Sequence, residues 1–147
     1  MEDGEVTQVP PHAVTSERYL LANLMCPAHP VEPLEPRYFY DRGHQLVGGA
    51  VWVLTQDGAP CTERAILRLL FDAKRYTWDA EIALRLLRLT PYTSRRELAQ
   101  HRANVVDAYH RRQVVNLLRD LAARAQSGED LASIRKSLTE ADVWGTT

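Results

Sequence analysis

The feature that most constrains the fold is a long stretch without proline or glycine, which runs from Tyr92 to Ser127. Ser94 and Glu97 have the spacing of a capping box, in which the two residues satisfy each other's free backbone donors at a helix N-terminus. We therefore expect one helix over residues 94–126, roughly 50 Å long at about 1.5 Å per residue. A compact domain of this size does not need so long a helix, so part of it should project.

Apolar residues recur at helical spacing in the second half of this stretch and again after Ser127-Gly128. A short glycine turn between two such stripes predicts an antiparallel helical hairpin. Each stripe is narrow, so the hairpin should need a further partner to bury what remains of it. The stripes are Val114, Leu118, Leu121 and Ala125, followed by Leu131, Ile134, Leu138 and Ala141.

Four shorter helices are expected before residue 92. Thr15 or Ser16 is a candidate N-cap for the first helix, and Asp41, Thr62 and Thr77 are candidates for the other three. The residues expected to face inward are Leu20, Leu21, Leu24 and Met25 in the first, Leu46, Val47, Ala50, Val51 and Leu54 in the second, Ile66, Leu69 and Leu70 in the third, and Ile82, Leu86 and Leu89 in the fourth.

Two features stand out around the second helix. The aromatic run Tyr38-Phe39-Tyr40 precedes it, and we expect this run to fill the core rather than to bind a base. Gly48 and Gly49 lie inside it, and each costs about 1 kcal/mol relative to alanine. They would allow a neighbouring helix to approach closely, or they would mark a local break.

No segment alternates polar and apolar residues in the way a strand requires, so we expect no sheet. The expected fold class is all-α: a small multi-helix bundle followed by a projecting antiparallel helical hairpin. The expected organisation is a flexible acidic arm over residues 1–9, a globular bundle over 10–92, the long helix and hairpin over 93–142, and a tail over 143–147.

Composition excludes several classes of protein. The chain has 147 residues, of which 45% are hydrophobic and 25% charged, as in an ordinary globular domain. It contains no G-x-x-x-x-G-K-[ST] motif, so it is not expected to be an independent ATPase. No signal peptide and no apolar run of about 20 residues is present, which predicts a cytoplasmic protein without a membrane span.

Metal and catalytic sites are not expected either. Cys26 and His29 form one C-x-x-H pair, whereas a structural zinc site usually needs two such pairs. We interpret Cys26 as a helix-end residue and His29 as a loop residue. Neither Cys26 nor Cys61 has a recognisable basic setting, and no G-x-S-x-G motif occurs. The sequence thus predicts no catalytic residue, no metal site and no cofactor.

The near-zero net charge hides an uneven distribution. Residues 94–126 contain seven arginines against three acids, and the first 36 residues contain six acids against Arg18 alone. This pattern favours self-association or the docking of a charged partner, although a solvated arginine face is an equally ordinary explanation. The arginines that we regard as candidate docking residues are Arg95, Arg96, Arg102, Arg111 and Arg112. Arg111 and Arg112 could also meet a phosphate, but direct DNA contact is expected to be weak or absent.

Taken in order, these features resemble the N-terminal domain of DnaB-type replicative DNA helicases. The resemblance covers roughly residues 9–142. The motifs that carry it are Val9-Pro10-Pro11-His12, Glu17 with Leu20-Leu21, Phe39 with His44 five positions later, Thr90-Pro91, Val105-Val106, Arg111-Arg112, Ala122-Ala123 and Gly128-Glu129-Asp130. The departures are Tyr19 and Asn23 in place of small apolar residues, Gly48-Gly49 inside a normally regular helix, and a chain end where the linker and motor domain would follow.

The resemblance implies assembly rather than catalysis. Domains of this family dimerise through their hairpins, form a collar on the helicase ring, and offer a docking surface to the C-terminal domain of primase and to helicase loaders. Phe39 and His44 correspond to core positions, for which we favour packing. Carried over, the hairpin seam at the dimer interface would consist of Val114, Leu118, Leu121, Ala125, Leu131, Ile134 and Leu138.

Two alternatives remain open at this point. The chain could be a stand-alone regulator, bacterial or phage-related, that binds and modulates a full-length helicase. It could also be a small arginine-rich nucleic-acid-binding protein, which predicts a salt-sensitive affinity for DNA.

Overall fold

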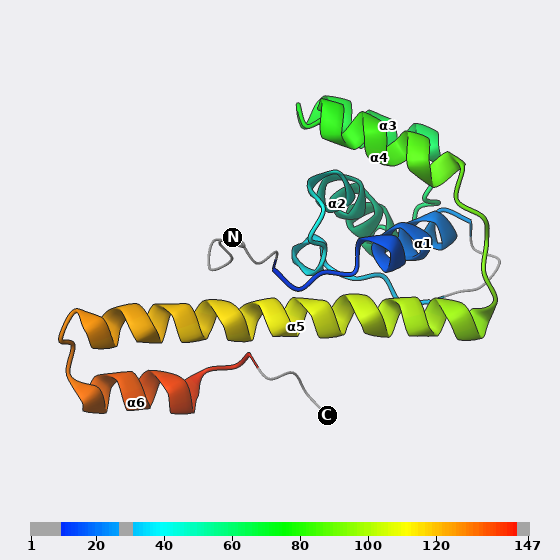
Figure 1. The fold of residues 1–147 in the computed structure, drawn as a ribbon. Coiled ribbons are helices and arrows are strands. Elements are labelled where there is room, and N and C mark those ends of the chain that lie inside the picture. The colour runs from blue at the N-terminus through cyan, green and yellow to red at the C-terminus, as the bar shows by residue number, and fades with distance from the viewer. Residues whose placement is uncertain (1–9, 27–30, 144–147) are drawn as a thin grey trace, which may run out of the picture. The chain divides into compact units, whose positions relative to one another are not determined.

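A computed structural model gives the structure of the chain and describes residues 10–26 and 31–143. These residues form six α-helices and one short 3-10 helix, with no strand among them (Figure 1). The all-α fold expected from the sequence is therefore confirmed. The described residues divide into two compact units, one within residues 13–106 and the other formed by residues 10–12 and 107–143. The expected arm and the end of the expected tail lie outside the described residues.

The six α-helices and the 3-10 helix follow one another in chain order. Their bounds are α1 (Val14–Leu24), η2 (Pro36–Tyr38), α2 (Arg42–Gln56), α3 (Glu63–Asp72), α4 (Trp78–Arg88), α5 (Arg95–Gln126) and α6 (Leu131–Glu140). Among the described residues, no helix combines the length and the apolar character that crossing a bilayer requires.

Three of the predicted N-caps are confirmed. A side-chain oxygen of Asp41 accepts a hydrogen bond from the backbone N–H of His44 at 3.0 Å. The hydroxyl groups of Thr62 and Thr77 accept from the N–H groups three residues further on, at 3.1 and 3.4 Å. At the start of α5, Ser94 Oγ accepts from the N–H of Glu97 at 3.2 Å and donates to Glu97 Oε1 at 3.1 Å.

The N-cap predicted for α1 is wrong. The helix begins at Val14 after Ala13, and no side chain caps it. Ser16 instead lies inside the helix and is buried, because its hydroxyl group serves a contact with α5. Its Oγ lies 2.9 Å from Nδ1 of His101 and accepts a hydrogen bond from Nδ2 of Asn104 at 3.1 Å.

Two departures from the DnaB pattern also contribute to contacts within residues 13–106. The ring of Tyr19 stacks on that of His101, with 4.7 Å between the ring centroids. Oδ1 of Asn23 accepts a hydrogen bond from the N–H of Thr93 at 3.4 Å. A small apolar residue at either position would lack these polar and stacking contacts.

The core lies within residues 13–106 and centres on α2, which contacts α1, η2, α3 and α4. The apolar face predicted for α2 is confirmed, since all five of its predicted residues are buried. Phe39, only 1% exposed, fills the core as expected. Leu98 and Val105 bring the first turns of α5 into the same cluster.

The inward face predicted for α4 is wrong. Leu86 and Leu89 are 41% and 81% exposed, and Ile82 is half-buried. The reason is the close approach of α4 to Gly43 of α2, where an added Cβ atom would lie only 2.4 Å from the carbonyl oxygen of Asp79. Only small side chains fit such a crossing, so α4 turns a face with two alanines inward. The residues buried on α4 are Ala80, Ala83, Leu84 and Leu87.

The role predicted for Gly48 and Gly49 needs a correction as well. Helix α2 passes through both without a break. The group that approaches Gly48 is the ring of Phe39 rather than a neighbouring helix, because an added Cβ would lie 2.7 Å from Cε2 of that ring. At Gly49 the nearest atoms belong to Pro36 at 3.9 Å, which is ordinary contact.

Candidate protein-interaction surface on the helical hairpin

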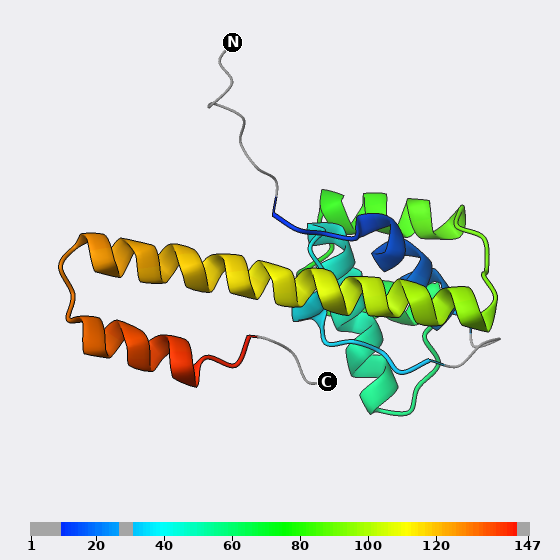
Figure 2. The same cartoon turned by 60° about the horizontal axis from the view of Figure 1, so that its bottom comes forward.

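The distal part of α5 and helix α6 form an antiparallel pair within one unit (Figures 1 and 2). Gly128 turns the chain with a φ of +86°, a region that glycine enters without steric cost. The N–H of Glu129 donates to the carbonyl oxygen of Arg124 at 3.0 Å, which closes the end of α5. A side-chain oxygen of Asp130 then caps α6 by accepting from the N–H of Ser133 at 3.3 Å.

An ion pair ties the turn to α5. Nε of Arg124 donates to Oε2 of Glu129 at 2.8 Å, and NH1 of Arg124 reaches Asp120 one turn back at 3.4 Å. The hydrogen bond from Arg124 lowers the pKa of the Glu129 carboxyl, against a smaller opposing effect of desolvation. The turn therefore has both a backbone and an electrostatic reason for its conformation.

Three leucines of the hairpin remain on its surface. Leu118 is 52% exposed, Leu131 is 75% exposed and Leu138 is 42% exposed. Leu118 and Leu138 lie at equal sequence distances from Gly128, so they should be level with each other along an antiparallel pair. The hairpin thus presents apolar side chains from both of its helices to solvent.

The other predicted seam residues divide between the inside and the outside of the hairpin. Leu121 is buried, and Val114 and Ile134 are half-buried. Ala125 is exposed, and no residue of α6 is fully buried. Within this chain the apolar stripes are consequently only partly covered.

The predicted docking arginines are divided between the two units. Arg95 and Arg96 are exposed in the first turn of α5, and Nε of Arg102 donates to the carbonyl oxygen of Glu32 at 3.0 Å. These three belong to residues 13–106, whereas Arg111 and Arg112 belong to the other unit. Arg111 pairs with Asp107 at 2.7 Å, and NH1 of Arg112 donates to the carbonyl oxygen of Pro11 at 2.9 Å.

A buried polar cluster lies apart from these surfaces. Glu17 is fully buried, and its two carboxylate oxygens accept from the N–H groups of Tyr40 at 2.7 Å and Asp41 at 3.2 Å. Oε1 of Glu17 also lies 2.9 Å from Nδ1 of His44, which is 3% exposed. The cluster ties α1 to the start of α2. No local sequence signal links Glu17 with His44, because the two residues lie 27 positions apart in the chain.

No group of three or more metal-binding side chains occurs in the described part of the chain. Cys26 and Cys61 are free thiols, both half-buried. Sγ of Cys61 lies 3.5 Å from Oγ1 of Thr55. His29, the other half of the C-x-x-H pair, lies outside the described residues.

Comparison with known proteins identifies the fold. A scan against protein-family models finds no match, and a search of curated proteins finds none either. Among solved structures, the chain is similar to the crystal structure of the N-terminal domain of DnaB helicase from Mycobacterium tuberculosis. The TM-score is 0.73 at 20% sequence identity, and the match covers 89% of this chain and 96% of that one. The chain thus has the fold of the N-terminal domain of DnaB helicase.

Proposed function

We propose that this chain is a non-catalytic assembly module of a DnaB-type replicative helicase, and that it self-associates through its helical hairpin. The fold shared with the N-terminal domain of DnaB helicase supports this proposal. The observation that carries it is the exposure of Leu118, Leu131 and Leu138 on the hairpin. Exposed apolar side chains on both helices of one hairpin are typical of a protein interface when they form a common patch.

The energetics favour a symmetric dimer. In a twofold interface each residue occurs twice, so every leucine contributes two buried side chains. Burying one fully exposed leucine is worth about 1.5–3 kcal/mol, and Leu131 is 75% exposed, so this position adds roughly 2–4 kcal/mol to the dimer. A polar substitution at Leu131 should therefore weaken the dimer by roughly thirtyfold or more.

Sedimentation equilibrium at tens of micromolar protein tests the proposal. The unmodified chain is expected to be a dimer, and Leu131→Asp is expected to shift it to a monomer. Leu131 is the most exposed of the three leucines, so its replacement should leave the fold of the monomer intact. Circular dichroism checks that the helix content is unchanged.

Leu89→Asp is the matched control. Leu89 is also a strongly exposed leucine, but it lies just after α4 and outside the hairpin. It is expected to leave the dimer unchanged. A monomeric unmodified chain, or an equal loss of dimer in both variants, would contradict the hairpin interface.

Docking of a primase C-terminal domain, a helicase loader or a full-length helicase is the second part of the proposal. Arg95 and Arg96 are exposed at the start of α5, where they are open to an acidic partner. Surface plasmon resonance with the primase C-terminal domain of the same organism tests this part. Binding should be lost in Arg95→Glu/Arg96→Glu and kept in Arg119→Glu, since Arg119 is an equally exposed arginine further along the same helix.

A further inference from the structure

A surface groove runs along α2 and α3, within residues 13–106. It consists of two neighbouring hollows of about 330 and 510 Å³, and Leu69 lines both of them. We call it the α2–α3 groove. The first hollow is lined by residues of η2, α2 and α3, and the second by the end of α2 and the first half of α3. No residue of the hairpin takes part in it.

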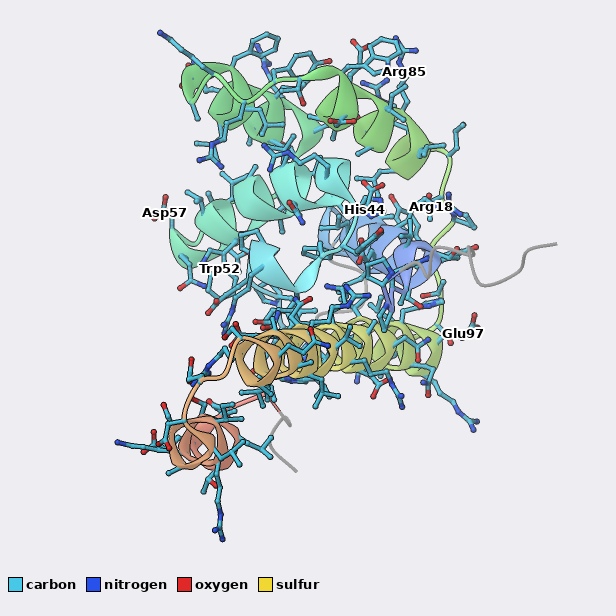
Figure 3. All side chains as sticks on the ribbon, turned by 60° about the vertical axis from the view of Figure 1, so that its left-hand side comes forward. Arg18, His44, Trp52, Asp57, Arg85 and Glu97 are labelled. Atoms are coloured by element: carbon cyan, nitrogen blue, oxygen red, sulfur yellow. The ribbon has the colours of Figure 1, made fainter. Side chains whose placement is uncertain are left out.

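The floor of the α2–α3 groove is apolar. Trp52 and Val53 contribute from α2, and Leu69 and Ala73 from the region of α3 (Figure 3 labels Trp52). Val53 is 45% exposed, and Trp52 and Leu69 are half-buried. Pro36 borders the floor on the side of η2. These side chains leave enough apolar surface for leucine-sized anchors of a partner.

Arginines line the α2–α3 groove beside this apolar floor, and no carboxylate is among the residues that line the groove. Arg64 and Arg68 line the second hollow, and Arg75 lines the first. The ion pairs between described residues engage other arginines, such as Arg85 with Glu81 and Arg88 with Glu63 on the neighbouring α4. The three groove arginines are thus charged groups without a carboxylate partner in the described part of the chain.

We propose that the α2–α3 groove binds a short acidic amphipathic helix of another protein. The apolar side chains of such a helix would lie on Trp52, Val53 and Leu69, in the way that amphipathic helices occupy grooves between helices. Its aspartate or glutamate side chains would meet Arg64, Arg68 and Arg75, and guanidinium groups bind carboxylates with two parallel hydrogen bonds. The positive charge of these three arginines favours an acidic helix over a basic one.

This binding site is independent of the proposed dimer. The groove residues belong to residues 13–106, whereas the exposed leucines belong to the hairpin. A variant that loses the dimer is therefore expected to keep the groove, and a groove variant to keep the dimer. The two proposals can fail separately.

Fluorescence anisotropy with a synthetic peptide tests the inference. The probe is a labelled helical peptide with leucines spaced three and four residues apart and glutamates on both flanks. It is expected to bind the unmodified chain and to bind Arg64→Glu/Arg68→Glu about tenfold more weakly or worse. Arg119→Glu makes the same type of charge change on an exposed part of α5 and is expected to bind as the unmodified chain does.

Two further peptides separate the groove from charge alone. A peptide with lysines in place of the glutamates is expected to bind Arg64→Glu/Arg68→Glu better than the unmodified chain, which also shows that the variant is folded. A peptide with serines in place of the leucines is expected to lose binding to the unmodified chain, because it has no apolar side chains to pack on the floor of the groove.

The inference would be overturned if the acidic peptide did not bind, or if its serine version bound equally well. It would also be overturned if Arg119→Glu weakened binding as much as Arg64→Glu/Arg68→Glu does. A further contradicting result is displacement of the peptide by single-stranded oligothymidylate at a lower concentration than by unlabelled peptide. The last result would assign the arginines to nucleic acid instead.

Discussion

The phenyl ring of Phe39 packs directly against the backbone of Gly48. A Cβ atom on Gly48 would lie 2.7 Å from Cε2 and 2.9 Å from Cδ2 of that ring. Phe39 is among the largest fully buried side chains of the chain, so the ring has little freedom to move away. Glycine at this position costs about 1 kcal/mol in helix propensity relative to alanine, but it leaves space for the ring.

Gly48→Ala and Gly49→Ala should therefore change stability in opposite directions. Overpacking against Phe39 is expected to cost about 1–3 kcal/mol, which outweighs the gain in helix propensity. At Gly49 the nearest atoms are 3.9 Å away, so alanine should stabilise α2 by about 0.5–1 kcal/mol. Urea unfolding followed by circular dichroism measures both. Equal shifts for these adjacent positions would contradict the packing of Phe39 described above.

Glu17→Gln should destabilise the bundle strongly. The carboxylate accepts from the N–H groups of Tyr40 and Asp41 and contacts Nδ1 of His44, all in a buried setting. An amide group turns an NH2 donor toward these donors, and each unsatisfied buried group costs about 1–3 kcal/mol. We expect a loss of about 2–4 kcal/mol in urea unfolding. Glu32→Gln, an exposed position, should change stability by less than about 0.5 kcal/mol.

The carboxyl of Glu129 should titrate below the usual value of about 4.3 for glutamate. Because Arg124 lowers its pKa in the folded chain, the ion pair stabilises the hairpin turn above the unfolded pKa. That contribution is lost as the pH falls through the lowered pKa. Titration followed by NMR is expected to show the pKa of Glu129 rising in Arg124→Gln and staying unchanged in Arg119→Gln. A pKa of Glu129 that stays the same in Arg124→Gln would contradict the ion pair.

Lys74→Gly should stabilise the chain. Lys74 follows α3 with a φ of +57°, a left-handed conformation that strains any residue with a Cβ atom. Glycine removes that strain, and we expect a gain of about 0.5–1 kcal/mol in thermal or urea unfolding. Lys74→Ala serves as the control, since it removes the same charge and keeps the Cβ. Equal stability of the two variants would show that charge, rather than the backbone, decides the outcome.

Local chemistry made part of the fold predictable. Asp41, Thr62 and Thr77 were identifiable as N-caps because capping depends on residues within three positions of each other. The inward face of α4 was not, because two apolar stripes compete on that helix. The close crossing with α2 at Gly43 selects the stripe with small residues, and no sequence pattern reports a contact with another helix. Ser16 shows the same limit, since its partners His101 and Asn104 lie on α5.

The candidate surfaces show a similar division. The apolar residues of the hairpin follow from helical spacing, but spacing does not tell that Leu121 is buried while Leu118 is exposed. The α2–α3 groove was missed altogether, because its floor and its arginines come from separate helices and assemble only in the fold.

The buried carboxylate of Glu17 also has a consequence for limited proteolysis. The three groups that depend on it follow it by 23 to 27 positions in the chain. Cleavage after α1 would leave their donors facing an apolar interior with no acceptor. Loss of this first helix should therefore unfold the residues up to Val106 together, so a protease that removes it is expected to leave no trimmed, stable fragment of the bundle.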